Sequence, residues 1–207
     1  NSSSGINTLT VLGLNTISNS IFKDIFIENC SPSTTNDFTV IKLSAVSGCK
    51  FINCNVIACS TGGNMFAIIN SGAVTNCHFD QCSVLNNPPA FNFWGFYVGS
   101  TFTGNIINQL RINGNSVSNF SCQGIDFANS VGASYNVFSD CVISKNTGGS
   151  TVCYGILNEG GNASNTFLRC VVSYNTSSGT TYGIAGDLSN WVVQDCIFEQ
   201  NNGSTDA

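Results

Sequence analysis

The stretches NIINQLRINGN, from Asn105 to Asn115, and NVFSDCVISKN, from Asn136 to Asn146, share one pattern. Both begin and end with asparagine and carry an apolar residue at the third and eighth positions. Five further stretches align with them without gaps, so the chain holds seven copies, which start at Ser20, Cys49, Cys77, Asn105, Asn136, Asn165 and Trp191. A fixed period of about 28 residues is the signature of a repeat architecture.

Three apolar columns run through the aligned copies. The third position holds Phe22, Phe51, Phe79, Ile107, Phe138, Phe167 and Val193, and the eighth holds Ile27, Val56, Val84, Ile112, Ile143, Val172 and Phe198. A further apolar element precedes copies two to seven, with the column Ile41, Ile68, Phe96, Ile125, Ile156 and Ile184, and Val11 or Leu12 is its equivalent in the first copy. We interpret these three columns as the inward faces of three strands per copy.

Three short strands per period, with no helical periodicity, predict an all-β fold. The arrangement is a right-handed parallel β-helix, a solenoid of about seven coils with three strands per coil, forming a single domain over residues 1–207. A sandwich or a propeller would require antiparallel hairpin turns at regular places, and it would not keep the same residue types in register along one column.

The spacing N-x-apolar-x-x-N-x-apolar-x-x-N resembles the parallel β-helix repeat family, whose fold is the pectate-lyase-like right-handed β-helix. The resemblance runs from about Leu9 to Asn201. It implies the fold and says little about function, because lyases, hydrolases, epimerases, adhesins and phage spikes share this architecture.

The last position of the copies predicts a ladder of stacked side chains, formed by Cys30, Cys59, Asn87, Asn115, Asn146, Asn175 and Asn201. Asparagine tolerates left-handed backbone at a corner, and its amide can bond the same residue one coil along. We interpret this ladder as structural.

Each of the 11 cysteines has a neighbour in its own column one coil away. The expected neighbours are Cys30 with Cys59, Cys49 with Cys77, Cys54 with Cys82, and Cys122 with Cys153, while Cys141, Cys170 and Cys196 run consecutively. Parallel Cβ vectors hold the β-carbons of adjacent strands too far apart for an easy disulfide. The sequence favours mostly buried free thiols and leaves coil-to-coil disulfides as the alternative. No Cys-x-x-Cys spacing occurs, so no metal site is predicted.

One outward polar cluster is a weak candidate for catalysis, because the predicted register brings Lys50, His78 and Asp80 together. A histidine beside a carboxylate can exchange protons with a substrate. The cluster contains neither the second carboxylate of a glycosidase nor an acidic trio for calcium. A solvated surface patch is therefore the favoured interpretation, and no cofactor is expected.

Two other outward features are predicted. Asp140 and Arg169 share a position on adjacent coils and should form a surface ion pair of small energetic value. Val142, Val171 and Ile197 form an apolar column that is either covered by the long turns or used in lateral contact.

The insertion NNPPAFNFWGFYVG brings several aromatic residues into one short stretch. Phe91, Phe93 and Trp94 are candidates for presenting a ring to a sugar. Packing of these rings over the turn is the favoured alternative.

Composition limits the partners. Only 8% of the residues are charged and the net charge is −5, so the surface must be covered by uncharged polar residues, as in secreted or cell-surface proteins. No basic run could follow nucleic acid, and no stretch of roughly 20 apolar residues could insert into a membrane. Neither end carries an amphipathic helix that would cap the solenoid, which favours self-association end to end or side by side.

Three functions remain open. The leading hypothesis is a structural or adhesive extracellular or cell-surface solenoid, which assembles into a filament or forms part of a longer surface protein. The second is a glycan-binding module or phage-type spike. The third, a polysaccharide lyase, hydrolase or epimerase, rests on the fold resemblance alone, so a non-enzymatic role is favoured.

Overall fold

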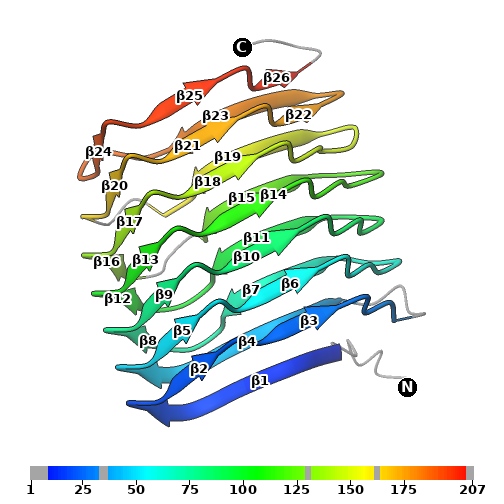
Figure 1. Cartoon of the computed structure of the whole chain (residues 1–207). Helices are drawn as coiled ribbons and strands as arrows, with labels where there is room; N and C mark the ends of the chain where they lie inside the picture. The colour runs from blue at the N-terminus through cyan, green and yellow to red at the C-terminus, as the bar shows by residue number, and fades with distance from the viewer. Residues whose placement is uncertain (1–8, 33–36, 129–131, 161–163, 204–207) are drawn as a thin grey trace, which may run out of the picture.

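The computed structural model describes residues 9–32, 37–128, 132–160 and 164–203, and every regular element in these ranges is a β-strand. Figure 1 shows the chain climbing in stacked coils from the blue N-terminal end to the red C-terminal end. The predicted parallel β-solenoid of about seven coils is therefore confirmed. Within the same ranges, no helix is long and apolar enough to cross a bilayer.

Three parallel sheets form the walls of the solenoid. Sheet A consists of β1 (Leu9–Ser18), β4 (Phe38–Ser47), β7 (Met65–Asn70), β8 (Val74–Thr75), β11 (Phe93–Val98), β12 (Phe102–Thr103), β15 (Cys122–Phe127), β16 (Ala133–Ser134), β19 (Val152–Asn158) and β23 (Thr180–Gly186). Sheet B consists of β2 (Ile21–Lys23), β5 (Lys50–Ile52), β9 (His78–Asp80), β13 (Ile106–Asn108), β17 (Val137–Ser139), β20 (Thr166–Leu168) and β24 (Val192–Gln194). Sheet C consists of β3 (Phe26–Glu28), β6 (Asn55–Ile57), β10 (Ser83–Leu85), β14 (Arg111–Asn113), β18 (Val142–Ser144), β21 (Val171–Ser173) and β25 (Ile197–Glu199). The short strands β22 (Thr176–Ser177) and β26 (Asn202–Gly203) pair with each other.

The apolar columns lie in register as the sequence predicts. In sheet B, Phe22, Phe51 and Phe79 are stacked with ring centroids 5.0 and 4.7 Å apart. In sheet A, Leu12 pairs with Ile41, so Leu12 is the first-coil member of that column. Sheet A departs from the expected single short strand, because β4 is 10 residues long and the corresponding segment of the next three coils is split into two strands.

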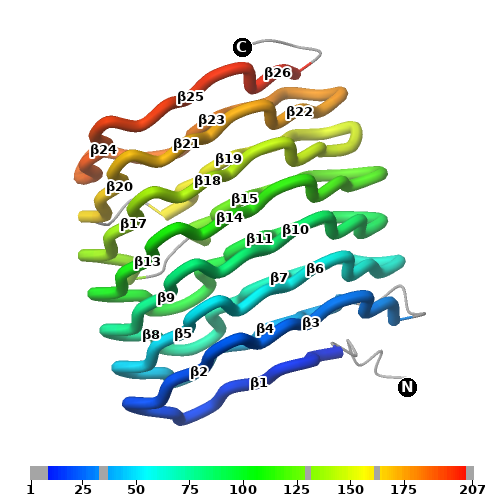
Figure 2. The backbone as a smooth tube through the Cα atoms, viewed as in Figure 1, coloured from blue at the N-terminus to red at the C-terminus, as the bar shows by residue number. Residues whose placement is uncertain are grey.

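The corners depend on left-handed backbone, at one residue earlier than the sequence analysis placed it. Lys145, with a φ of 55°, directly precedes the ladder residue Asn146, and Asp140, with a φ of 54°, directly precedes Cys141. The smooth tube of Figure 2 shows the resulting corners repeating from coil to coil. The left-handed residue turns the chain, and the residue after it supplies the inward side chain of the ladder.

The asparagine ladder satisfies buried polar groups inside the core. The side-chain nitrogen of Asn115 donates to the side-chain oxygen of Asn146 at 2.8 Å and to the carbonyl of Val84 at 3.2 Å. The backbone N–H of Asn115 donates to the same Asn146 oxygen at 3.2 Å. Asn105, Asn136 and Asn165 form a second ladder of this kind at another corner.

Cysteine replaces asparagine in the ladder without breaking it. The backbone N–H of Cys59 donates to the side-chain oxygen of Asn87 at 2.8 Å, as a ladder asparagine would. The Cys59 thiol contacts the carbonyls of Ile27 and Ile57 at 3.8 and 3.6 Å. The thiol therefore replaces the bond that a ladder asparagine amide donates to a carbonyl of the preceding coil.

We expect Asn146→Ala to destabilise the fold by about 3 kcal/mol, because it removes the acceptor of the buried Asn115 backbone N–H and amide, together with the bond that Asn146 donates to the Ile112 carbonyl. Asn146→Cys should cost less, since a thiol can reach the Ile112 carbonyl as Cys59 reaches that of Ile27. Urea unfolding measures both, with exposed Asn190→Ala as the control. Equal losses for the alanine and control variants would contradict the ladder's role.

Candidate functional site

The outer face of sheet B brings together the three residues predicted as weak catalytic candidates. Lys50 pairs in register with His78, and Asp80 follows two residues later on β9. All three line a hollow of about 370 Å³, together with Ile52, Phe79, Ile106, Asn108 and Ser139. Among these lining residues, Asp80 is the one carboxyl group, so the hollow lacks the carboxylate pair that glycoside hydrolysis uses.

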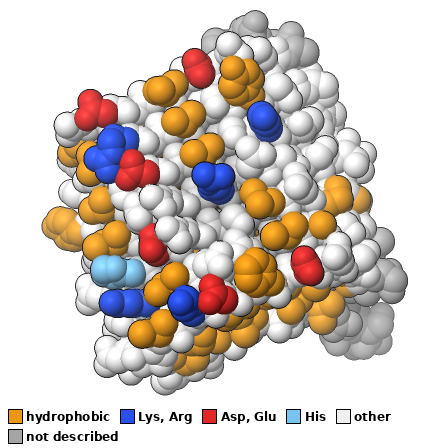
Figure 3. Space-filling view, viewed as in Figure 1, with side chains coloured by type: hydrophobic (Ala, Val, Ile, Leu, Met, Phe, Trp, Pro, Cys, Tyr) orange, Lys and Arg blue, Asp and Glu red, His pale blue; other side chains and the backbone are white. Residues whose placement is uncertain are grey.

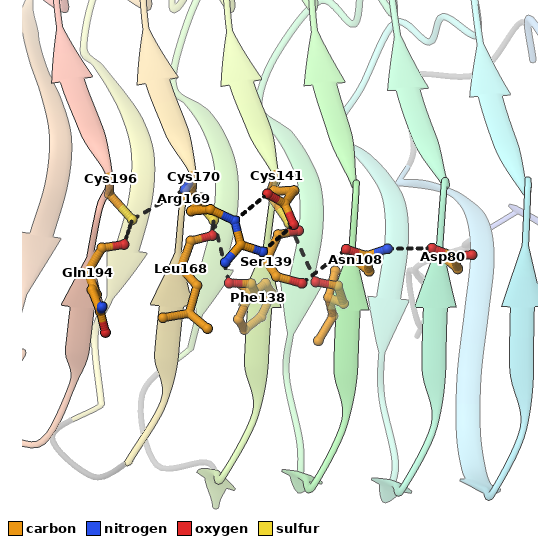
Figure 4. A network of polar contacts seen from close by, with 12 residues as sticks. Asp80, Asn108, Phe138, Ser139, Cys141, Leu168, Arg169, Cys170, Gln194 and Cys196 are labelled. Carbon is orange, nitrogen blue, oxygen red and sulfur yellow. Dashed lines mark hydrogen bonds and ion pairs between the residues drawn. The ribbon is translucent and has the colours of Figure 1, made fainter.

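Asp80 is held in a row of polar side chains that crosses three coils (Figure 4). The side-chain nitrogen of Asn108 donates to one Asp80 oxygen at 2.7 Å, and the hydroxyl of Ser139 donates to the Asn108 oxygen at 3.0 Å. These bonds fix Asp80 against the sheet, which is the arrangement of a structural polar ladder.

The predicted ion pair on the neighbouring corner is confirmed. The Arg169 guanidinium donates twice to the Asp140 carboxylate, at 2.8 and 2.7 Å, as Figure 4 shows. This contact lowers the pKa of Asp140. Figure 3 shows charged side chains of both signs scattered over this face with apolar ones between them, so no single-sign patch forms there.

The three aromatic candidates have different surroundings. Phe91 is 38% exposed and stacks on Phe120, with ring centroids 5.4 Å apart. Phe93 is fully buried in the core of sheet A, so its ring lies inside the solenoid and neither faces solvent nor packs over the turn. Trp94 is half-buried on the outer face, and its ring stacks on Phe66 at 4.4 Å.

A glycine column explains why sheet A presents two outward residues in quick succession. A Cβ on Gly95 would lie 2.6 Å from the carbonyl oxygen of Gly124 and 2.8 Å from Ile112 of sheet C, so only glycine fits between the walls. Phe96, the next residue, also points inward and is fully buried. As a result, Trp94 and Tyr97 both lie on the outer face, three residues apart.

The outer face of sheet A therefore carries an aromatic cluster that the sequence analysis missed, apart from Trp94. We call Phe66, Trp94, Tyr97, Tyr154 and Tyr182 the aromatic face. Tyr97 makes an edge contact with Phe66 at 5.3 Å, and Tyr154 stacks on Tyr182 at 5.3 Å. The sequence signal was the recurrence of an aromatic residue at the same position of the third element.

Strand β15 places two polar residues inside the aromatic face. Gln123 pairs in register with Trp94 and Tyr154, and Asp126 pairs with Tyr97 and Leu157. The two polar side chains are only 8% and 2% exposed. They lie between the Phe66–Trp94 pair on one side and the Tyr154–Tyr182 pair on the other.

Asp126 is incompletely bonded. The indole N–H of Trp94 donates to one carboxylate oxygen at 3.0 Å. The other Asp126 oxygen and the Gln123 side-chain oxygen are buried without a hydrogen-bond partner among the described residues. Burial, followed by the nearby charge of Glu159, raises the pKa of Asp126 to about 7. The ion pairs found between described residues join Lys23 to Asp24 and Arg169 to Asp140, so no basic side chain neutralises Asp126.

The cysteines are all free thiols in the structure. Cys122 and Cys153 are register partners in sheet A, as the sequence predicts, and both are fully buried. A hydrogen bond with Cys153, together with burial, raises the pKa of Cys122, so this thiol stays protonated at neutral pH. In the described ranges, no group of three or more histidine, cysteine or carboxylate side chains could hold a metal ion.

The sequence matches no protein-family model, and no curated protein is similar enough to count as a relative.

We expect Asp126→Asn to remove a pH-dependent loss of stability. The folded-state pKa of about 7 lies above the ordinary value of 3.8, so the folded chain keeps a proton that the unfolded chain loses. Stability should therefore fall as pH rises from about 4 to 8, by about 4 kcal/mol in total. The asparagine variant should lack this loss.

Urea unfolding across this pH range is the measurement, and Glu28→Gln, which alters an exposed carboxyl group on sheet C, is the matched control. If wild type and Asp126→Asn lose stability in parallel, the Asp126 carboxyl is not titrating in a buried site.

Proposed function

We propose that this chain is an adhesive β-solenoid that binds carbohydrate through the aromatic face of sheet A. The observation that carries the proposal is the presence of five rings on one sheet face, with two buried acceptors between them that have no hydrogen-bond partner among the described residues. Aromatic rings offer a sugar an apolar surface, while the polar groups between them fix its orientation.

The scaffold suits this role because it holds the rings rigidly. Adjacent coils are about 4.8 Å apart, and the rings lie on β7, β11, β19 and β23, so an extended ligand could contact several coils at once. Rings that are already stacked on one another lose little conformational freedom when a ligand binds.

The proposal includes an extracellular or cell-surface location and membership of the pectate-lyase-like superfold. The low charge content of 8% supports the first, and the asparagine ladders support the second. A binding role is favoured over hydrolysis by the sheet B hollow, where a single carboxyl group is bonded to an amide.

Native gel electrophoresis through soluble polysaccharides tests the binding role. The gels would contain neutral glucomannan, basic chitosan or acidic polygalacturonate. At least one polysaccharide should retard the wild-type chain, and Trp94→Ala or Tyr154→Ala should weaken that binding at least roughly tenfold, the worth of one aromatic contact.

Phe91→Ala, which alters a ring outside the aromatic face, should bind as wild type does. Circular dichroism would establish that the variants are folded. Normal migration of the wild-type chain in every gel would contradict the proposal.

A second candidate function is lateral self-association through sheet C. Val142, Val171 and Ile197 lie in register on its outer face, and Ile197 is 50% exposed. An apolar column of this kind could pair with a second copy. The end-to-end stacking expected from the sequence stays a prediction.

Sedimentation velocity of the chain at increasing concentration tests the lateral contact. We expect a dimer that Val171→Lys shifts to monomer, whereas Thr166→Lys on sheet B leaves it unchanged. A monomer at roughly 100 μM, corresponding to a dissociation energy weaker than about 5 kcal/mol, would rule out this contact.

A further inference from the structure

The two free acceptors on β15 define what kind of group the aromatic face can take. A carboxylate oxygen and an amide oxygen accept hydrogen bonds and donate none. Both lack a partner among the described residues although they are buried, and leaving such atoms unbonded is costly. A matching ligand group must therefore donate hydrogen bonds.

The charges around Asp126 further limit which ligand groups can bind there. The titratable groups that act on Asp126 or respond to its charge are Tyr97 on β11, Tyr154 on β19 and Glu159 just after β19. None of these is cationic. An acidic ligand would add negative charge beside Asp126 and Glu159, and a neutral hydroxyl would leave Asp126 protonated, whereas an ammonium group favours the ionised carboxylate and pairs with it.

The rings favour the same ligand charge. The faces of tryptophan, tyrosine and phenylalanine attract cations through the ring quadrupole. The Trp94 indole N–H is bonded to Asp126 at 3.0 Å, so the carboxylate lies at the edge of the indole ring, while the ring itself is stacked on Phe66. The two acceptors are more deeply buried than the half-buried rings, so a ligand group reaches them only if the side chains above them move aside.

We propose that the aromatic face binds an amino sugar, whose ammonium group donates to the free oxygens of Asp126 and Gln123 while its ring lies against the aromatic side chains. This assignment rests on the proposed glycan-binding function and specifies its ligand class as a cationic glycan. It assigns Asp126 as the charge partner and Gln123 as the second acceptor.

The test compares two oligosaccharides with the same backbone, the β-1,4-linked hexamers of glucosamine and of N-acetylglucosamine. Acetylation removes the positive charge and leaves the sugar rings in place. Calorimetry at about pH 6.5 in roughly 0.3 M salt, which screens the general attraction of a cation to a chain of net charge −5, should show at least tenfold tighter binding of the glucosamine hexamer.

Asp126→Asn should abolish this preference, because the amide removes the charge and presents a donor in place of an acceptor. Glu28→Gln removes the same charge from sheet C and should leave the preference intact. A second readout is proton release. When the ammonium group binds, the Asp126 carboxyl group gives its proton to the buffer, so the binding heat of wild type should vary with buffer ionisation enthalpy and that of Asp126→Asn should not.

The outcomes separate the two proposals. Equal or tighter binding of the acetylated hexamer, still dependent on Trp94, would overturn the cationic assignment and retain glycan binding. A glucosamine preference that survives Asp126→Asn would also overturn the assignment. Failure of both hexamers to bind, together with normal migration in all polysaccharide gels, would overturn both.

Discussion

The rest of the structure depends on a corner in which a left-handed residue is followed by a buried side chain that bonds the next coil. Lys145 and Asn146 illustrate the unit: the first turns the chain, and the second accepts two hydrogen bonds from Asn115 of the preceding coil. A corner that slipped by one residue would place the amide outside and leave those donors buried without partners. The ladder thus sets the register, and the register places every column on its face.

Because the interior repeats from coil to coil, the coils differ from one another mainly on their outer faces. Sheet B presents charged and amide side chains that bond one another along the stack, with Asp80 held by Asn108. Sheet A presents rings, together with a carboxylate that has one unpaired oxygen. In sheet B, Asp80, Asn108 and Ser139 are bonded to one another. On sheet A, the two acceptors that lack a partner among the described residues would gain hydrogen bonds from a ligand that donates to them.

Much of the fold could be predicted from sequence because each column repeats at a fixed period. The apolar columns, the asparagine ladder and the neighbour of each cysteine all follow from aligning the copies, and the proximity of Lys50, His78 and Asp80 follows from the same register. The alignment could not show which neighbour of the ladder residue adopts the left-handed conformation, because side chains as different as Lys145 and Asp140 occupy that position.

The site on sheet A was harder to predict for a physical reason. Simple alternation along a strand would not place both Trp94 and Tyr97 outside, and the close approach of Gly95 to Ile112 is what allows two successive inward residues. Phe93, which directly precedes the outward-facing Trp94, is buried in the core as simple alternation requires. The burial of Asp126 depends on side chains from several coils, and no pattern within one copy reports it.

Native-state hydrogen exchange of the corner amides tests the central claim most directly. The backbone N–H groups of Asn87, Asn115 and Asn146 each donate to an asparagine side-chain oxygen one coil along. If the ladder sets the register, these amides open only when the coils separate, so they should exchange as slowly as the amides of the buried strands. Exchange at the rate of exposed turn amides would show that the corners open independently, and it would contradict the account.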